Sequence, residues 1–165
     1  MRTTCDGTVR LGQVIGLPVV LHGRMIGRVE QTWLTEDGRR LRGLVMRRGL
    51  GAARWSPWED VLALGEVSVI LRREPGKPPK GGGDGLHAVK DTGGMNLGRV
   101  TDVYVSRATG RVTALEISLG LIEELTCGRV VARTFAVRPT PAEPGLVLIP
   151  CGCAVEYPQG KGVAR

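Results

Sequence analysis

The sequence predicts an all-β protein built from two small barrels, which a linker rich in proline and glycine joins. The first observation is residues 27–46, two apolar runs around Asp37-Gly38, which is a strong hairpin signal. The second is that this pattern recurs 71 residues later, at residues 98–117. The third is composition: 25 Gly, 10 Pro and only 4% aromatic residues favour short strands, frequent turns and an aliphatic core over long helices.

The first predicted module covers residues 9–74. Residues 1–10 are expected to be a loose arm, and residues 11–14 a helical turn or the start of a strand. Alternation along the central strand predicts Val29 and Trp33 on one face, with a solvent-exposed face opposite. A single helical turn is expected after Ser56, which is a suitable cap for Pro57 at the first helical position. Strands are expected at residues 17–21, 25–34, 41–46, 52–56 and 67–71.

The predicted linker covers residues 75–83, where three prolines precede a triple glycine. We expect a stiff part followed by a flexible part, with no residue buried. The second module, residues 84–156, repeats the plan of the first, and residues 157–165 form a tail. Its strands are expected at residues 86–89, 96–106, 112–119, 129–137 and 146–149, with a short helical turn at 121–125.

A set of short motifs carries a resemblance to a known family. In chain order they are Ile26-Gly27-Arg28-Val29, Gly38-Arg39, the apolar strand 41–46, the turn 57–61 and Leu64-Gly65-Glu66-Val67. Together they resemble the PRC-barrel family, well over residues 14–73 and more weakly over residues 86–150. The resemblance implies two SH3-like barrels of the PRC type in tandem. It also implies non-catalytic docking on another macromolecule, as in the cytoplasmic barrel of the photosynthetic reaction-centre H subunit and the C-terminal barrel of the ribosome maturation factor.

The chain is basic, with a net charge of +7 that is unevenly distributed. Residues 1–74 hold 12 basic and 8 acidic groups, whereas residues 84–165 hold 9 and 8. This excess is either a solvated surface or a contact for nucleic acid, acidic lipid or an acidic protein. The N-terminus lacks an apolar signal segment and no apolar run is long enough to span a bilayer, so we expect a soluble, cytoplasmic protein.

The four cysteines are expected to be free thiols. Cys127, Cys151 and Cys153 are weak metal candidates, because a Cys-x-Cys pair with one further cysteine lacks the spacing and the fourth ligand of a zinc site. A redox-active pair is the other alternative. Neither His22 nor His87 accompanies a nucleophile motif. We therefore expect no enzyme, no cofactor and no small-molecule substrate.

The candidate partner-binding residues surround the first hairpin and the strand after it. Arg40 and Arg42 are expected to project to the same side of a strand and to pair with carboxylates or phosphates. Trp55, in a loop-like context, is the expected exposed anchor. The alternative is a set of separately solvated arginines near Glu36 and Asp37. The full set is Arg39, Arg40, Arg42, Arg47, Arg48, Arg54 and Trp55.

These features favour a non-catalytic adaptor that binds a protein partner through its barrel surfaces. An RNA- or ribosome-associated module is the alternative, motivated by the net charge and the concentration of arginine. Peripheral contact with a membrane complex and self-association also stay open.

Overall fold

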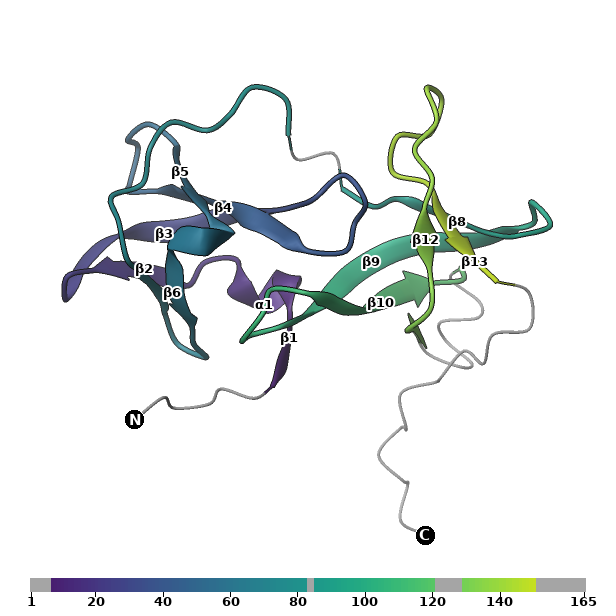
Figure 1. Cartoon of the computed structure of the whole chain (residues 1–165), viewed down its shortest axis with the longest axis horizontal. Coiled ribbons are helices and arrows are strands. Elements are labelled where there is room, and N and C mark those ends of the chain that lie inside the picture. Colours follow the sequence, from purple (N-terminus) through teal and green to yellow (C-terminus); the bar gives the residue numbers. More distant parts are fainter. Residues whose placement is uncertain (1–6, 83–84, 121–128, 151–165) are drawn as a thin grey trace, which may run out of the picture. The chain divides into compact units, whose positions relative to one another are not determined.

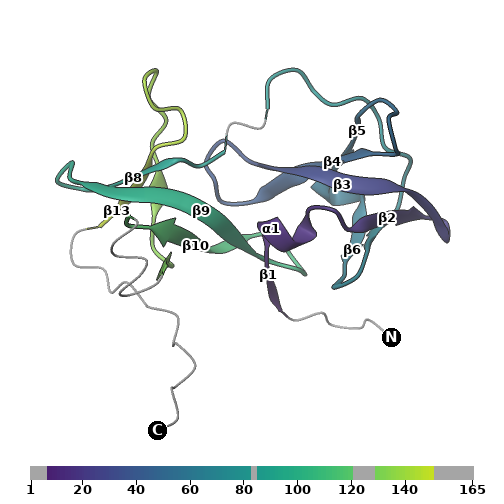
Figure 2. The ribbon, with the colours of Figure 1, turned by 180° about the vertical axis from the view of Figure 1, so that it is seen from behind.

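The computed structural model describes residues 7–82, 85–120 and 129–150. It confirms the all-β prediction, because two sheets make up most of the described chain. The first is six-stranded, with the order β5-β4-β3-β2-β7-β6. Figures 1 and 2 show these strands from two sides. Their bounds are β2 Pro18–Leu21, β3 Arg24–Leu34, β4 Leu41–Arg47, β5 Arg54–Pro57, β6 Val61–Leu64 and β7 Val69–Leu71.

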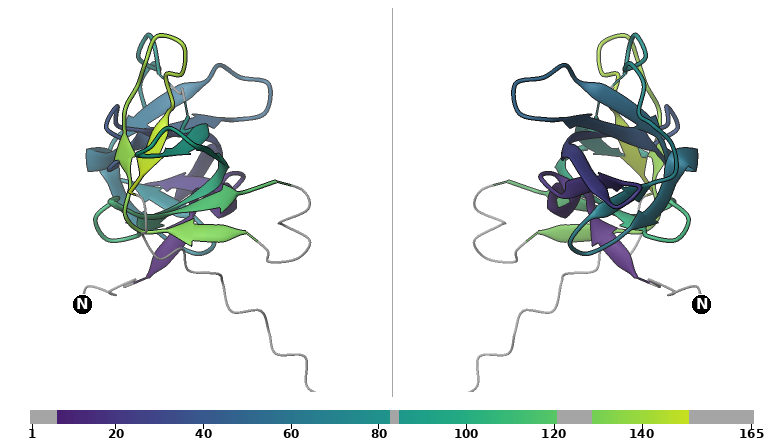
Figure 3. Two further views of the ribbon diagram at one scale, coloured as in Figure 1. Left: turned by 90° about the vertical axis from the view of Figure 1, so that its right-hand side faces the viewer. Right: turned by 90° about the vertical axis from the view of Figure 1, so that its left-hand side faces the viewer.

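The second sheet repeats this order strand for strand, as β11-β10-β9-β8-β13-β12. In both sheets the first and last strands of the plan pair in parallel, β2 with β7 and β8 with β13, while the remaining pairs along the path are antiparallel. End-on views show the curvature of the sheets (Figure 3). The bounds are β8 Ala88–Asp91, β9 Asn96–Ser106, β10 Val112–Ser118, β11 Val130–Ala132, β12 Ala136–Val137 and β13 Val147–Ile149.

The chain divides into two compact units that do not follow a single cut in the sequence. Unit 1 comprises residues 1–85 and 104–113, and unit 2 comprises residues 86–103 and 114–165. The tip of the β9–β10 hairpin therefore belongs to unit 1. The predicted module boundaries, 9–74 and 84–156, remain predictions.

The N-terminal arm is not loose over its described part. Strand β1, Thr8–Arg10, pairs antiparallel with residues 104–106, and the short helix α1, Leu11–Val14, follows it directly. Val9 is buried opposite the buried Val105. A single apolar side chain between polar neighbours gives too weak a sequence signal to predict a strand whose partner lies about a hundred residues away.

A β-bulge overturns the predicted face of Trp33. Val29 pairs with Met46, but the register shifts after Val29, and Trp33 then pairs with Gly43. Because Gly43 and Met46 are three residues apart on β4, Val29 and Trp33 project to opposite faces of the sheet. Val29 and Met46 belong to the inner core, whereas Trp33 lies on the other face, where its ring is next to that of Trp55.

The inner core of unit 1 is aliphatic, as the composition predicts. Strand β4 is buried on both faces, since Leu44 and Met46 point one way and Val45 the other, and all three are at most 4% exposed. The other buried apolar residues of this sheet include Val19, Leu21, Leu64, Val69 and Leu71.

The helical turn after β5 forms as the short 3₁₀ helix η1, Trp58–Asp60, but Ser56 does not cap it. Pro57 is the N-cap residue, and no side chain bonds to the free amides of the turn. Ser56 lies on β5 opposite Leu44 and is 1% exposed. Pairing with β4 extends the strand past Ser56 and displaces the start of the turn by one residue.

The predicted strand 129–137 is two strands, β11 and β12, because residues 133–135 turn the chain between different neighbours. The helical turn 121–125 and the tail 157–165 lie outside the described residues. Within the described part of the chain, no helix has the length and apolar character needed to cross a membrane.

The β3–β4 turn makes folding stability sensitive to acid. Asp37 accepts hydrogen bonds from the Thr35 hydroxyl and the Arg39 amide. The bond from Thr35 is the main cause that lowers the pKa of Asp37 below its usual value. The carboxylate therefore stabilises the fold above the unfolded pKa, and this contribution is lost as pH falls through the lower folded pKa.

We expect wild-type protein to lose more unfolding free energy than Asp37→Ala between about pH 5 and about pH 2. Urea unfolding at each pH measures the difference. The exposed Glu36→Ala change is the matched control, and an equal loss in all three proteins would contradict the prediction.

Candidate functional site

Arginines from two distant parts of the sequence meet on unit 1. Arg40 and Arg111 are direct partners in an isolated antiparallel bridge. The bridge is held by two backbone hydrogen bonds, from the Leu41 amide to Gly110 O at 2.8 Å and from the Val112 amide to Arg39 O at 2.9 Å. Directly opposed residues on paired strands project to the same face, so two positive charges lie side by side.

Arg39 and Arg42 flank this pair along the chain, and both are exposed. We call the four residues Arg39, Arg40, Arg42 and Arg111 the arginine cluster. Within the described residues, none of the four forms an ion pair. The cluster therefore presents positive charge to solvent, which the nearby Asp37 carboxylate offsets in part at Arg39.

The other predicted arginines mostly have partners inside the protein. Arg47 pairs with Glu30 at 3.1 Å and donates to Gly51 O at 3.0 Å. Arg54 pairs with Glu74 at 3.4 Å and donates to Pro75 O at 2.8 Å. Arg48 is exposed. The structure thus separates Arg47 and Arg54, which support the fold, from the arginine cluster.

Trp55 is not the exposed anchor that its sequence context suggests. It is half-buried, and its ring centroid lies 4.8 Å from that of Trp33 at an interplanar angle of 38°. The Arg42 guanidinium carbon lies 5.9 Å from the Trp55 ring centroid, within cation–π range. Gly43 makes this packing possible, because a Cβ there would lie 2.6 Å from Trp55 Cζ2. The Trp58 ring lies equally close to Gly110, where a Cβ would be 2.6 Å from Trp58 Cε2.

Sequence reasoning missed Arg111 and Gly43 as members of these surfaces. Arg111 had a signal, since Gly110-Arg111 repeats the turn Gly38-Arg39, but the repeat did not indicate that the two turns pair with each other. A glycine inside a strand marks a close approach, and Gly43 carried that signal.

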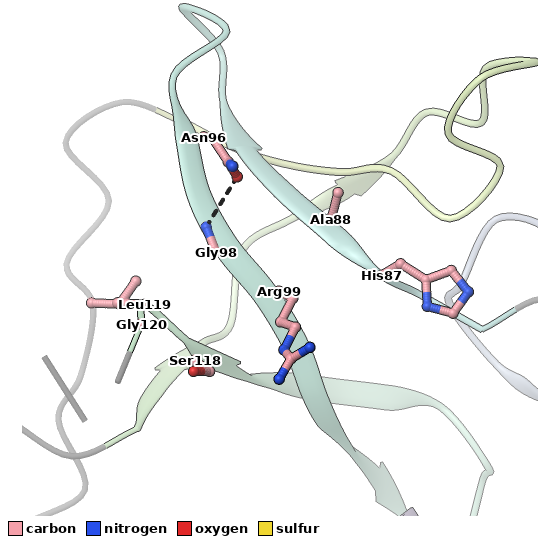
Figure 4. Close-up of a pocket in the computed structure, with 8 residues that line it drawn as sticks. All are labelled: His87, Ala88, Asn96, Gly98, Arg99, Ser118, Leu119 and Gly120. Atoms are coloured by element: carbon pink, nitrogen blue, oxygen red, sulfur yellow. Dashed lines mark hydrogen bonds between the residues drawn. The ribbon is translucent and has the colours of Figure 1, made fainter. Parts of the chain in front are cut away.

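Unit 2 contains an open hollow of about 510 Å³ (Figure 4). His87 precedes β8, Asn96 and Arg99 lie on β9, and Ser118 ends β10. The Gly98 amide donates to Asn96 Oδ1 at 3.3 Å. Arg99 supplies positive charge and no lining residue is acidic, so the hollow favours an anionic over a cationic group. Ser118 stands where the first copy of the pattern has Arg47.

No metal centre is found in the described chain, where no group of three His, Cys, Asp or Glu side chains converges. The weak candidates Cys127, Cys151 and Cys153 lie outside the described residues.

A family model of the PRC-barrel domain matches residues 85–163. The match falls on the second copy, although the motifs noted in the sequence are clearer over residues 14–73. A comparison with curated proteins finds no match. The PRC-barrel match and the shared strand order describe architecture, so the question of function rests on the surfaces.

Proposed function

We propose that this protein is a non-catalytic docking protein made of two PRC-type barrels. Its arginine cluster binds an acidic surface on a protein partner. The identical strand order of the two sheets supports a tandem pair of barrels. Docking agrees with what the PRC-barrel resemblance implies for the family.

The observation that carries this proposal is the Arg40–Arg111 bridge. Like charges directly opposite on paired strands destabilise a sheet. Within the described residues no carboxylate pairs with either arginine. A carboxylate from a partner relieves the repulsion and accepts charge-assisted hydrogen bonds, which are about twice as strong as neutral ones.

A protein partner fits this surface better than single-stranded RNA does. Proteins that bind single strands combine cationic grooves with exposed aromatic rings on which bases stack. Trp33 is 8% exposed and Trp55 is half-buried, so neither ring presents an open stacking face next to the cluster. RNA binding remains the second candidate because the surface charge alone attracts phosphate.

We expect Arg40→Ser/Arg111→Ser to weaken binding of a fluorescent polyglutamate peptide about tenfold, or about 1.4 kcal/mol. Fluorescence anisotropy with the full chain measures it. Arg24→Ser/Arg72→Ser is the matched control, since it removes the same charge from exposed sites of unit 1 and should change binding less than about twofold.

A labelled single-stranded RNA provides the competing measurement. If both double variants weakened peptide binding equally, the binding site would not be localised to the arginine cluster. Tighter binding of RNA than of the peptide, lost in the cluster variant and falling steeply with salt, would favour the RNA alternative and overturn the protein-docking proposal.

A further inference from the structure

The segment 75–82, which we call the proline segment, is docked on unit 1 instead of lying free in solvent. Gly76 and Trp55 exchange two backbone hydrogen bonds, each 2.8 Å long. Strand β5 is the edge of its sheet, so the proline segment adds pairing to an otherwise open edge (Figure 1). Pro75 is buried, which corrects the prediction that no residue of 75–83 would be.

Side chains of unit 1 hold the proline segment at both ends. At its start, the Arg54 guanidinium donates to Pro75 O at 2.8 Å. At its end, Gly82 lies against the face of Trp33, where a Cβ would be 2.6 Å from Trp33 Cε3. Between these anchors, Pro78 and Pro79 are half-buried. The segment therefore runs from Arg54 and Trp55 to Trp33. The Trp33 and Trp55 rings pack against each other at a tilt of 38°.

The two tryptophan rings, the Arg54 guanidinium and the open strand edge are groups suited to binding a proline-rich peptide. Proline fixes its own φ, and the residue before it is held extended, so little conformational entropy is lost when such a segment binds. Proline-rich peptides are bound by faces lined with aromatic rings. Their carbonyl groups have no internal hydrogen bonds and are free to accept from a donor such as the Arg54 guanidinium.

We propose that the Trp33–Trp55 face, together with Arg54 and the β5 edge, is a binding site for proline-rich peptide segments, occupied in the resting molecule by the chain's own residues 75–82. A proline-rich partner gains the site by displacing the proline segment. Arg42 of the arginine cluster lies over Trp55, but neither Arg40 nor Arg111 belongs to this site. The peptide test and the Arg40→Ser/Arg111→Ser test can therefore give opposite results.

Occupation by the tethered segment sets the affinity for a partner. A segment joined directly to its site competes at a local concentration on the order of millimolar. The intact protein is therefore a weak binder, and release of the proline segment raises the affinity for a free peptide.

The test uses a peptide with the sequence of residues 74–82 and the full-length chain labelled with ¹⁵N. The indole N–H resonances of Trp33 and Trp55 report binding. We expect Pro75→Ser/Pro78→Ser/Pro79→Ser to bind this peptide at least about tenfold more tightly than wild type. Gly76→Pro removes only the amide that donates to Trp55 O, and it should also raise the affinity for the peptide. It replaces the triple variant in the test if that variant does not fold.

The matched control is Pro139→Ser/Pro141→Ser/Pro144→Ser, which removes three exposed prolines from unit 2 and should bind as wild type does. A peptide with alanine for each proline should not bind. The proposal is overturned if both variants fold and about 1 mM peptide shifts the Trp33 or Trp55 indole resonance in neither of them.

Discussion

Gly43→Ala should destabilise unit 1 by about 3 kcal/mol, because the sheet has no room for a side chain at this position. A Cβ there would meet the backbone oxygen of Ser56 and would lie 2.6 Å from both Trp55 Cζ2 and Cη2. Neither side can give way easily, since Ser56 is on the paired strand β5 and the Trp55 ring packs against Trp33. Displacing the ring also removes an aromatic contact worth about 0.5–1.5 kcal/mol.

Urea unfolding followed by tryptophan fluorescence measures this loss directly, since all three tryptophans, Trp33, Trp55 and Trp58, lie in unit 1. Gly7→Ala is the matched control, because a Cβ at Gly7 meets no atom within 4 Å. We expect the control to change stability by less than about 0.5 kcal/mol. A Gly43→Ala protein as stable as this control would show that the tryptophan pair is not packed as described.

The long hairpins were predictable because their signals are local. Alternation and the Asp37-Gly38 turn place one hairpin, and the predicted strand 96–106 matches the bounds of β9. The face of Trp33 was not predictable, because a bulge that shifts pairing by one residue reverses every later side chain. A period of two in the sequence contains no information on where such a shift occurs.

The surfaces were only partly predictable for a related reason. A run of arginines shows where charge is concentrated, but it does not show which arginines have partners within the fold. Arg47 and Arg54 lie in the same run as Arg40, yet they bond to Glu30 and Glu74. Pairing of Arg40 with Arg111 depends on strand contacts between residues 71 positions apart, which composition cannot reveal.

The shared strand order of the two sheets leads to the second large prediction, at Gly98 of unit 2. Gly27 and Gly98 occupy equivalent places, each next to the end of the return strand of its copy. A Cβ at Gly27 would lie 2.8 Å from Arg47 O. At Gly98 it would collide with the backbone oxygen of Ser118, and the φ of +140° is one that side-chain-bearing residues rarely adopt.

Gly98→Ala should therefore cost about 4 kcal/mol, combining backbone strain with steric overlap, and should cost more than Gly27→Ala. Tryptophan fluorescence and far-ultraviolet circular dichroism distinguish the effects of the two changes. Unit 2 holds no tryptophan, so Gly98→Ala should move the urea transition seen by far-ultraviolet circular dichroism more than the one seen by fluorescence. Gly27→Ala should move the fluorescence transition. If Gly98→Ala shifted both transitions equally, the two copies would unfold as a single cooperative block, and a tandem repeat of separately stable barrels would be the wrong description of this chain.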